Sequence, residues 1–383
     1  MTYKKLVELA DVESGGTPSR RIPTFWGGNI PWIKISNITS DLTCEYDETI
    51  TEDGLKNSSA KIFKKGTILY TIFATLGETS ILGIDAATNQ AIAGITIKDQ
   101  SILAKYLLYF LKSIKNKIVS AGQGVAQHNI NLSILRDVNV PCPALSSQQT
   151  VIFCLDSLSE AIRREKEEMA LLDSLVKSRF MEMFQFSEKS SPSICLEDLT
   201  EFVTVGIANS ATQAYRESGV PMLRNQNIRE NRLDDGDLVF IDEKFAEKYA
   251  SKKLKHNDIL ITRTGYPGIA CLVPEKFENC QTFTTLICRL KSDAPVTPGF
   301  LCHFINSPLG KEYVKKNQVG VAQQNFGAKQ LAKMPIKVPS KELQDKFLSF
   351  AEAANKSVVI IEKEIRDYQE LFDSKMQLYF GVL

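Results

Sequence analysis

The sequence has no long hydrophobic run, no closely paired cysteines and no strong excess of charge of either sign. No apolar stretch approaches the ~20 residues that a membrane-spanning helix needs, and no apolar segment typical of a signal peptide follows residues 1–5. The eight cysteines are scattered and include no Cys-x-x-Cys pair, so a zinc site is not expected. Unpaired thiols are typical of a reducing compartment. These absences predict a soluble, cytoplasmic protein that makes no membrane contact.

Motifs that carry catalytic chemistry are also missing. The sequence contains no G-x-x-x-x-G-K-[ST] phosphate loop and no G-x-G-x-x-G segment after a strand. It also lacks the Asn/Asp-Pro-Pro-aromatic motif of adenine methyltransferases. The three histidines, His128, His256 and His303, do not have the spacing of metal ligands. We therefore predict that this chain has no catalytic residue, no metal and no cofactor of its own.

Charge is nearly balanced, with 46 Lys and Arg residues against 45 Asp and Glu residues and a formal net charge of +1. DNA-binding domains often carry a clear basic excess, so this balance argues mildly against a large DNA-binding face. Short basic clusters nevertheless recur in both halves of the chain. Each one alone is more typical of a solvated surface than of a phosphate site: residues 20–21, 61–65, 112–117, 252–255 and 311–316.

One segment of the sequence occurs twice. Gly-Val-Ala-Gln-His-Asn at residues 124–129 returns as Gly-Val-Ala-Gln-Gln-Asn at residues 320–325, an offset of 196 (320 − 124 = 196). The same offset then holds without a gap over about sixty positions, which indicates a duplicated unit. Identical pairs at this offset include Leu135 and Leu331, Pro143 and Pro339, Gln148 and Gln344, Glu168 and Glu364, Leu175 and Leu371, and Phe184 and Phe380.

A long helix is predicted at the end of each copy. Residues 146–186 contain no proline or glycine, and their apolar residues recur with the heptad spacing of a coiled-coil seam. We predict that the two helices pair as an antiparallel coiled coil; the alternative is that each one only covers the core of its own domain. Glu165, Arg179 and Lys375 interrupt the seam. The predicted seam residues are Val151, Leu155, Leu158, Ile162, Met169, Leu172, Val176, Phe347, Val358, Ile361, Ile365 and Phe372.

Further apolar residues lie off this seam. Phe153, Leu171, Leu175, Phe180 and Phe184 widen the apolar face of the first helix. Because a helix must bury its apolar face, this width predicts a surface that accepts helices from another protein.

The segments that precede the helices are predicted as mixed α/β domains. In the first, strands are expected at residues 32–35, 67–72, 92–97 and 138–140, and a helix at 103–118. The second repeats this order more loosely, with offsets that rise from 190 to 194. The prediction is therefore an α+β fold with a pseudo-two-fold internal repeat: domains at 1–145 and 187–339, and long helices at 146–186 and 340–383.

Polar side chains that can read base edges gather near the predicted strand ends. Arg and Lys pair with guanine, and Asn and Gln pair with adenine, so these residue types indicate DNA recognition. The alternative interpretation is that Asn and Gly shape turns and that the amides cap backbone groups. The predicted DNA-binding residues are Arg20, Arg21, Lys34, Asn37, Gln127, His128, Asn129, Arg224, Asn225, Asn227, Arg263, Tyr266, Gln323, Gln324 and Asn325.

Together these features resemble the specificity (S) subunit of a type I restriction–modification system. The resemblance covers essentially the whole chain. It rests on Gly-Gly-Thr-Pro at 15–18, Ile-Pro-Trp at 30–32, the segments 219–224 and 258–265, and both Val-Ala-Gln-x-Asn stretches. It implies two target-recognition domains joined by two long conserved helices. The first half departs from the second, because Ile72 stands where the second half has Arg263, so a loop arginine is missing there.

The resemblance also implies a function. The S subunit is not catalytic; each domain reads one half of a bipartite, asymmetric site in double-stranded DNA, and the helix pair fixes the unread gap. Two methyltransferase (M) subunits that carry S-adenosylmethionine dock on it, and restriction (R) subunits join for cleavage, so S-adenosylmethionine, ATP and Mg are expected only in the partners. The alternatives are a coiled-coil scaffold without a DNA role, or a single-chain methyltransferase or an accessory subunit of a nuclease.

Overall fold

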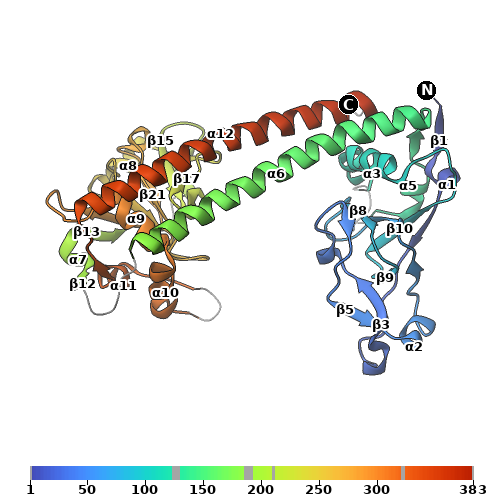
Figure 1. The fold of residues 1–383 in the computed structure, drawn as a ribbon, viewed down its shortest axis with the longest axis horizontal. Helices are drawn as coiled ribbons and strands as arrows, with labels where there is room; N and C mark the ends of the chain where they lie inside the picture. The colour runs from blue at the N-terminus through green and yellow to red at the C-terminus, as the bar shows by residue number, and fades with distance from the viewer. Residues whose placement is uncertain (1, 123–129, 185–192, 209–211, 321–323, 382–383) are drawn as a thin grey trace. The chain divides into compact units, whose positions relative to one another are not determined.

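The computed structural model describes residues 2–122, 130–184, 193–208, 212–320 and 324–381. The chain divides into two compact units. Unit 1 consists of Met1–Lys166 and Glu362–Leu383, and unit 2 consists of Glu167–Ile361. Each unit contains a globular part and one piece of each of two long helices, α6 (Leu145–Met183) and α12 (Lys341–Phe380) (Figure 1). Because α6 passes from unit 1 into unit 2 and α12 passes back, the two helices run in opposite directions.

The globular part of unit 1 is built on two sheets. The larger has the strand order β2-β10-β7-β8-β4, from β2 (Ala10–Ser14), β10 (Ile92–Ile97), β7 (Ile68–Thr71), β8 (Thr79–Leu82) and β4 (Leu42–Thr43). The second has the order β5-β3-β9-β6, from β5 (Glu48–Ile50), β3 (Trp26–Ile33), β9 (Ala86–Thr88) and β6 (Ile62–Phe63). A short ladder joins β1 (Tyr3–Lys5) to β11 (Asn139–Pro141). The helices are α1 (Leu6–Leu9), α2 (Glu52–Lys56), α3 (Ala104–Ser113), α4 (Lys115–Gly122) and α5 (Leu132–Arg136).

Unit 2 repeats the central strands of this topology and differs at the sheet edges. Its first sheet has the order β13-β22-β19-β20, from β13 (Thr200–Val205), β22 (Leu286–Leu290), β19 (Ile259–Ile261) and β20 (Ala270–Leu272). Its second has the order β14-β18-β15-β21, from β14 (Tyr215–Arg216), β18 (Val239–Ile241), β15 (Val220–Arg224) and β21 (Gln281–Phe283). Two ladders pair β12 (Ser193–Cys195) with β23 (Pro335–Lys337) and β16 (Ile228–Arg229) with β17 (Arg232–Leu233). The helices are α7 (Leu196–Leu199), α8 (Glu243–Glu247), α9 (Pro298–Asn306), α10 (Pro308–Asn317) and α11 (Ala328–Ala332).

A fully buried glutamine joins each long helix to the globular part beside its first turns. In unit 1, Gln148 accepts a hydrogen bond from the Leu103 N–H (2.9 Å) and donates to the carbonyls of Ser101 (2.7 Å) and Pro143 (2.9 Å). Gln344 in unit 2 repeats all three bonds. Each glutamine satisfies backbone groups that precede a domain helix and the long helix itself, and these groups would be costly to leave unpaired in the interior. The equivalent partners of Gln344 are Thr297 (2.8 Å), Pro295 (2.9 Å) and Pro339 (3.1 Å).

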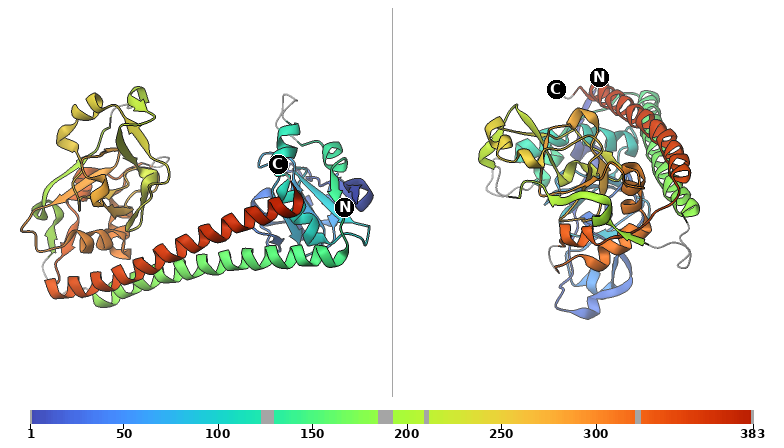
Figure 2. Two further views of the ribbon diagram at one scale, coloured as in Figure 1. Left: turned by 90° about the horizontal axis from the view of Figure 1, so that it is seen from above. Right: turned by 90° about the vertical axis from the view of Figure 1, so that its left-hand side faces the viewer.

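The long helices contact both each other and the domain cores. In each unit a segment of α6 lies beside a segment of α12 (Figures 1 and 2). In unit 1, Val151 and Leu155 share a core with Phe372 and Phe380. In unit 2, the Phe180 and Phe347 rings lie 5.1 Å apart and belong to the domain core. Within each unit the seam residues therefore pack against the other long helix and also into the domain core, so neither helix covers only its own core. All twelve predicted seam residues are buried or half-buried.

Two sequence predictions need correction. The helix expected at 103–118 is two helices, because the backbone leaves helical geometry at Ile114, between α3 and α4. Phe180 and Phe184 are each only 2% exposed in the core of unit 2, so they are not part of an outward apolar face. Phe153, Leu171 and Leu175 do remain exposed on α6.

Candidate nucleic-acid interface

A tight turn follows the same strand in both units. In unit 1 it is the 3₁₀ turn Ile35–Asn37 after β3, and in unit 2 it is Asn225–Asn227 after β15. The Asn37 side chain accepts a hydrogen bond from the Lys34 N–H at 2.9 Å, and Asn227 accepts from the Arg224 N–H at the same distance. The two asparagines therefore hold the turns closed, as the alternative interpretation of these residues proposed.

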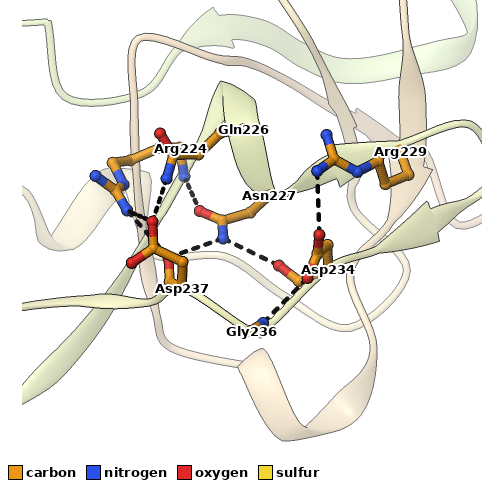
Figure 3. Close-up of polar contacts among 7 residues, drawn as sticks. All are labelled: Arg224, Gln226, Asn227, Arg229, Asp234, Gly236 and Asp237. Carbon is orange, nitrogen blue, oxygen red and sulfur yellow. Dashed lines mark hydrogen bonds and ion pairs between the residues drawn. The ribbon is translucent and has the colours of Figure 1, made fainter. Parts of the chain in front are cut away.

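Asn227 is not available at the surface. It is only 1% exposed, and its amide nitrogen donates to the carbonyls of Asp234 (3.0 Å) and Asp237 (3.1 Å) (Figure 3). Because both ends of its side chain are used inside the fold, the prediction that Asn227 contacts DNA is not supported by its position. Asn37 is more open, and its amide donates to Asp47 at 3.2 Å.

An exposed aspartate lies against the basic residue of each turn. The Arg224 guanidinium lies 3.1 Å from the Asp237 carboxylate, which also accepts a hydrogen bond from Gln226 (2.5 Å) (Figure 3). In unit 1 the Lys34 ammonium lies 3.3 Å from Asp47. The two aspartates are related by the offset that relates Lys34 to Arg224 (237 − 47 = 190 and 224 − 34 = 190). Our sequence reasoning missed them, although this shared offset could have revealed them.

The unit 1 turn is also tied to the predicted Arg20. The Arg20 guanidinium pairs with Glu48 at 2.5 Å and lies over the Trp26 ring, 3.6 Å from its centroid. Glu48 also binds Lys34 at 2.9 Å. Hydrogen bonds from Arg20 and then Lys34 lower the pKa of Glu48 below its ordinary value, so it remains ionised. Arg21 is exposed, and the described part of the chain offers it no ion pair.

A second shared element is the loop between two sheet strands, residues 71–78 in unit 1 and 262–269 in unit 2. In both, the amide of a glycine donates to the carbonyl of the first threonine at 2.9 Å, from Gly77 to Thr71 and from Gly268 to Thr262. The Thr262 hydroxyl then donates to the Tyr266 carbonyl (2.7 Å) and accepts from the Ile269 N–H (2.9 Å). Thr71 makes the equivalent bonds, to the Thr75 carbonyl and from the Glu78 N–H. The loop backbone is thus the same in both units.

Side chains on the two loops differ. Tyr266 is 85% exposed at the tip of the unit 2 loop. The Arg263 Nε donates to the Asn325 side chain at 3.1 Å, whereas Ile72 at the equivalent position is only 3% exposed in the unit 1 core. The backbone carbonyls of these two residues nevertheless accept equivalent hydrogen bonds. Ile72 accepts from the Ile130 N–H (3.0 Å), and Arg263 accepts from the Phe326 N–H (2.9 Å).

The unit 2 elements are connected to one another. The Asn225 amide donates to the Thr264 hydroxyl at 2.9 Å, which links the turn to the loop. Thr264 and Asn325 form a β-bridge, which links the loop to the segment before α11. Arg224, Asn225, Arg263, Tyr266 and Asn325 therefore belong to one continuous polar surface of unit 2. Gln324 is an exposed neighbour of Asn325, whereas Gln127, His128, Asn129 and Gln323 lie outside the described residues.

Within the described ranges, no three His, Cys, Asp or Glu side chains are grouped so that they could hold a metal ion. In the same part of the chain, no helix combines the length and the hydropathy that a bilayer span requires. What the surface offers is therefore hydrogen-bond donors, acceptors and cations on fixed loops, which are the groups that read base edges and phosphates.

Comparison with known proteins agrees with this chemistry. The family model described as type I restriction modification DNA specificity domain matches residues 1–172 and 191–368. The MjaIX specificity subunit of Methanocaldococcus jannaschii is 23% identical over 408 residues, which cover 99% of this chain and 93% of that protein. The EcoR124I/EcoR124II specificity subunit of Escherichia coli is 27% identical over 179 residues, which cover 43% of this chain and 44% of that protein.

Two solved structures share the fold. The type I restriction–modification S subunit of M. genitalium superposes with a TM-score of 0.54 at 14% identity, over 98% of this chain and 95% of that one. A chain solved in work on complex assembly of the type I R-M system gives 0.58 at 13% identity, over 99% and 97%. Since the family model covers both halves, this chain belongs to the type I restriction–modification specificity subunits, the non-catalytic chains that recognise the DNA sequence in these systems.

Proposed function

We propose that each unit reads one half of a bipartite, asymmetric site in double-stranded DNA through its turn and its loop. The observation that carries this proposal is the pair of loops at 71–78 and 262–269. Their backbone hydrogen bonds are the same, but Arg263 and Tyr266 in one are Ile72 and Thr75 in the other. Two loops with the same backbone hydrogen bonds but different side chains present different donors and acceptors, so the two half-sites should differ in sequence.

The residues proposed to contact DNA are only partly equivalent in the two units. In unit 2 they are Arg224, Asn225, Arg263, Tyr266, Gln323, Gln324 and Asn325. In unit 1 they are Arg20, Arg21, Lys34, Asn37, Gln127, His128 and Asn129. Since Asp47 and Glu48 pair with Lys34, and Asp237 pairs with Arg224, in the free chain, DNA would compete with these carboxylates for the two cations.

We further propose that two M subunits dock on the chain and that R subunits join the full complex. Phe153 and Leu171 are 76% and 69% exposed on α6, and Ile360 and Leu378 are 60% and 70% exposed on α12. Such side chains favour the docking of partner helices. S-adenosylmethionine, ATP and Mg would be bound by these partners. In this proposal α6 and α12 also set the length of the unread spacer, because both helices run from one unit into the other.

Methylation-sensitive sequencing of DNA from cells that carry the chain with its M subunit tests the proposal. The expected result is a single methylated motif with two different halves and a spacer of fixed length. A contiguous motif, or identical half-sites in inverted orientation, would contradict the assignment of one half to each unit. As a matched control, cells with the M subunit alone should show no such motif.

A further inference from the structure

The helices α3 and α9 occupy equivalent places, but their surroundings differ. At an offset of 194 their core residues correspond, for example Tyr106 to Phe300 and Phe110 to Phe304, and all four are buried. The buried glutamines Gln148 and Gln344 fix both helices to the long helix of their own unit. Any difference between the two sites therefore comes from the remaining side chains.

In unit 1, three polar side chains of α3 and α6 bond to one another. The Lys105 ammonium pairs with the Asp156 carboxylate at 2.8 Å, and the Tyr109 hydroxyl donates to the other carboxylate oxygen at 2.6 Å. Burial, and then the bond to Asp156, raises the pKa of Tyr109, so its hydroxyl remains a donor. The Lys105 ammonium and the Tyr109 hydroxyl thus both bind the Asp156 carboxylate, so the polar groups of this site are paired within the chain.

Unit 2 has the same site without the lysine. Gly299 stands in place of Lys105 (299 − 105 = 194), His303 in place of Tyr109, and Glu352 in place of Asp156 (352 − 156 = 196). A cavity of about 380 Å³ opens at this position, and Gly299, His303 and Glu352 all line it. Within the described residues, neither the Glu352 carboxylate nor the His303 imidazole has a hydrogen bond or an ion pair.

The remaining lining of the cavity defines what it can accept. Its other charged side chains are already paired, Asp173 with Arg232 (3.7 Å) and Glu230 with Lys177 (2.6 Å), so Glu352 is the unbalanced charge. Burial lowers the pKa of His303 to about 4, so its imidazole is neutral at pH 7 and has a nitrogen that accepts a hydrogen bond. Aliphatic side chains form much of the wall: Leu172, Val176, Leu272, Leu348 and Val358.

We propose that this unit 2 cavity binds a primary alkylammonium group, with the ammonium against Glu352 and His303 and the alkyl stem along the aliphatic wall. The equivalent site of unit 1 supplies that chemistry from its own chain, through Lys105 and Asp156. The group in unit 2 comes from outside: the side chain of a lysine on a bound protein partner, or a free aliphatic amine. This inference is independent of the DNA-reading proposal, because the cavity uses none of the residues of the polar surface.

The full-length chain, free of DNA, can be tested with n-butylammonium as probe and n-butanol as its neutral control. Saturation-transfer NMR should detect butylammonium and give a weaker signal or none for butanol. Glu352→Gln should weaken butylammonium binding by about tenfold, since it removes the anion that pairs with the cation. Equal binding of the two probes, or unchanged binding in Glu352→Gln, would overturn the proposal.

A second pair of variants tests the position of the group. Gly299→Lys introduces the lysine that unit 1 has, and it should abolish butylammonium binding while the melting temperature stays the same or rises. Gly299→Ala is the matched control: like the lysine variant it adds a Cβ that meets the flexible Leu348 side chain at 2.8 Å, but it leaves the cavity open, so binding should persist. Equal loss in both variants, or loss in neither, would refute the assignment.

The same probe distinguishes the two sources of the amine. In the complex assembled with the M subunit, a partner lysine in the cavity would block butylammonium, and Gly299→Lys would weaken assembly relative to Gly299→Ala. Continued binding of butylammonium in the complex, together with normal assembly of Gly299→Lys, would assign the cavity to a free amine.

Discussion

Arg263 gives the sharpest test of base reading. Its Nε is held by Asn325 at 3.1 Å, while in the described structure its two terminal nitrogens have no partner. An arginine held in this way presents two parallel donors, which is the arrangement that binds the O6 and N7 atoms of guanine. A bidentate pair of this kind contributes about 1–3 kcal/mol of discrimination against the wrong base. Since 1.4 kcal/mol corresponds to a factor of ten, Arg263→Ala should lose roughly 5- to 150-fold of discrimination at one base pair.

The assay is the rate of methylation of a set of duplexes by the complex with the M subunit. Each duplex carries one substitution in the recognised site. Arg263→Ala should relax the requirement at a single position of one half-site and leave the other half-site unchanged. Asn325→Ala should have a smaller effect at the same position, because it frees the arginine without removing it.

Lys276→Ala is a suitable control, since it removes one positive charge from unit 2 at a surface ion pair with Asp235. Its effect should be small and the same for all duplexes. If Arg263→Ala weakened every duplex equally and reduced the salt dependence of binding, Arg263 would be a phosphate contact and the reasoning would be wrong.

Three further predictions follow from individual contacts. Asp237→Asn should raise the affinity for unrelated DNA in a gel-shift assay, because it removes the negative charge that pairs with Arg224 in the unbound chain, although the bond from Arg224 to the carbonyl of residue 237 remains; unchanged affinity would show that the carboxylate does not compete with DNA. Gln344→Leu should destabilise unit 2 by about 3 kcal/mol, at about 1 kcal/mol for each of three buried backbone groups left unpaired, as measured by hydrogen exchange. The fluorescence of the two tryptophans, which both lie in unit 1, should keep its unfolding midpoint. The pKa of His303 is lowered from an ordinary 6.5 to about 4 in the folded chain, so between these pH values the unfolded chain binds a proton that the folded chain does not. As the pH falls from 6.5 to 4, native unit 2 should therefore lose stability relative to the His303→Asn variant.

The repeat and the class of the fold could be predicted because their signals are additive along the chain. Many weak matches at one offset identify a duplication, and a seam of alternating four- and three-residue steps identifies a long helix. The offset of 190 correctly paired Lys34 with Arg224, and the structure places them on equivalent turns. Local periodicity and spacing carry this information without any knowledge of tertiary contacts.

Other features depend on contacts that periodicity does not encode. Asn227 looks the same in sequence whether its amide faces DNA or the carbonyls of Asp234 and Asp237. The apolar period continues through Ile114, so the end of α3 left no signal. Phe180 and Phe184 lie off the heptad seam because they pack into the unit 2 core, which the seam alone could not show. For Asn227 and for the two phenylalanines, the contacts made in the folded chain decide the role, and periodicity does not report them.

In the proposed function, the two loops allow one fold to carry different base-contacting side chains. Gly265 has a φ of +79°, a conformation that glycine adopts without strain, whereas Ala74 at the same position in unit 1 holds a φ of +59°. A left-handed alanine costs roughly 1–2 kcal/mol, so the hydrogen bonds of Thr71 and Gly77, rather than the residue at the tip, must impose the loop shape. Because the hydrogen bonds of the threonine and the glycine fix the loop backbone, the side chains between these two residues can change without a change of fold. Under the proposed function, positions such as 72 and 263 are therefore among those at which the side chains that the two units offer to DNA can differ.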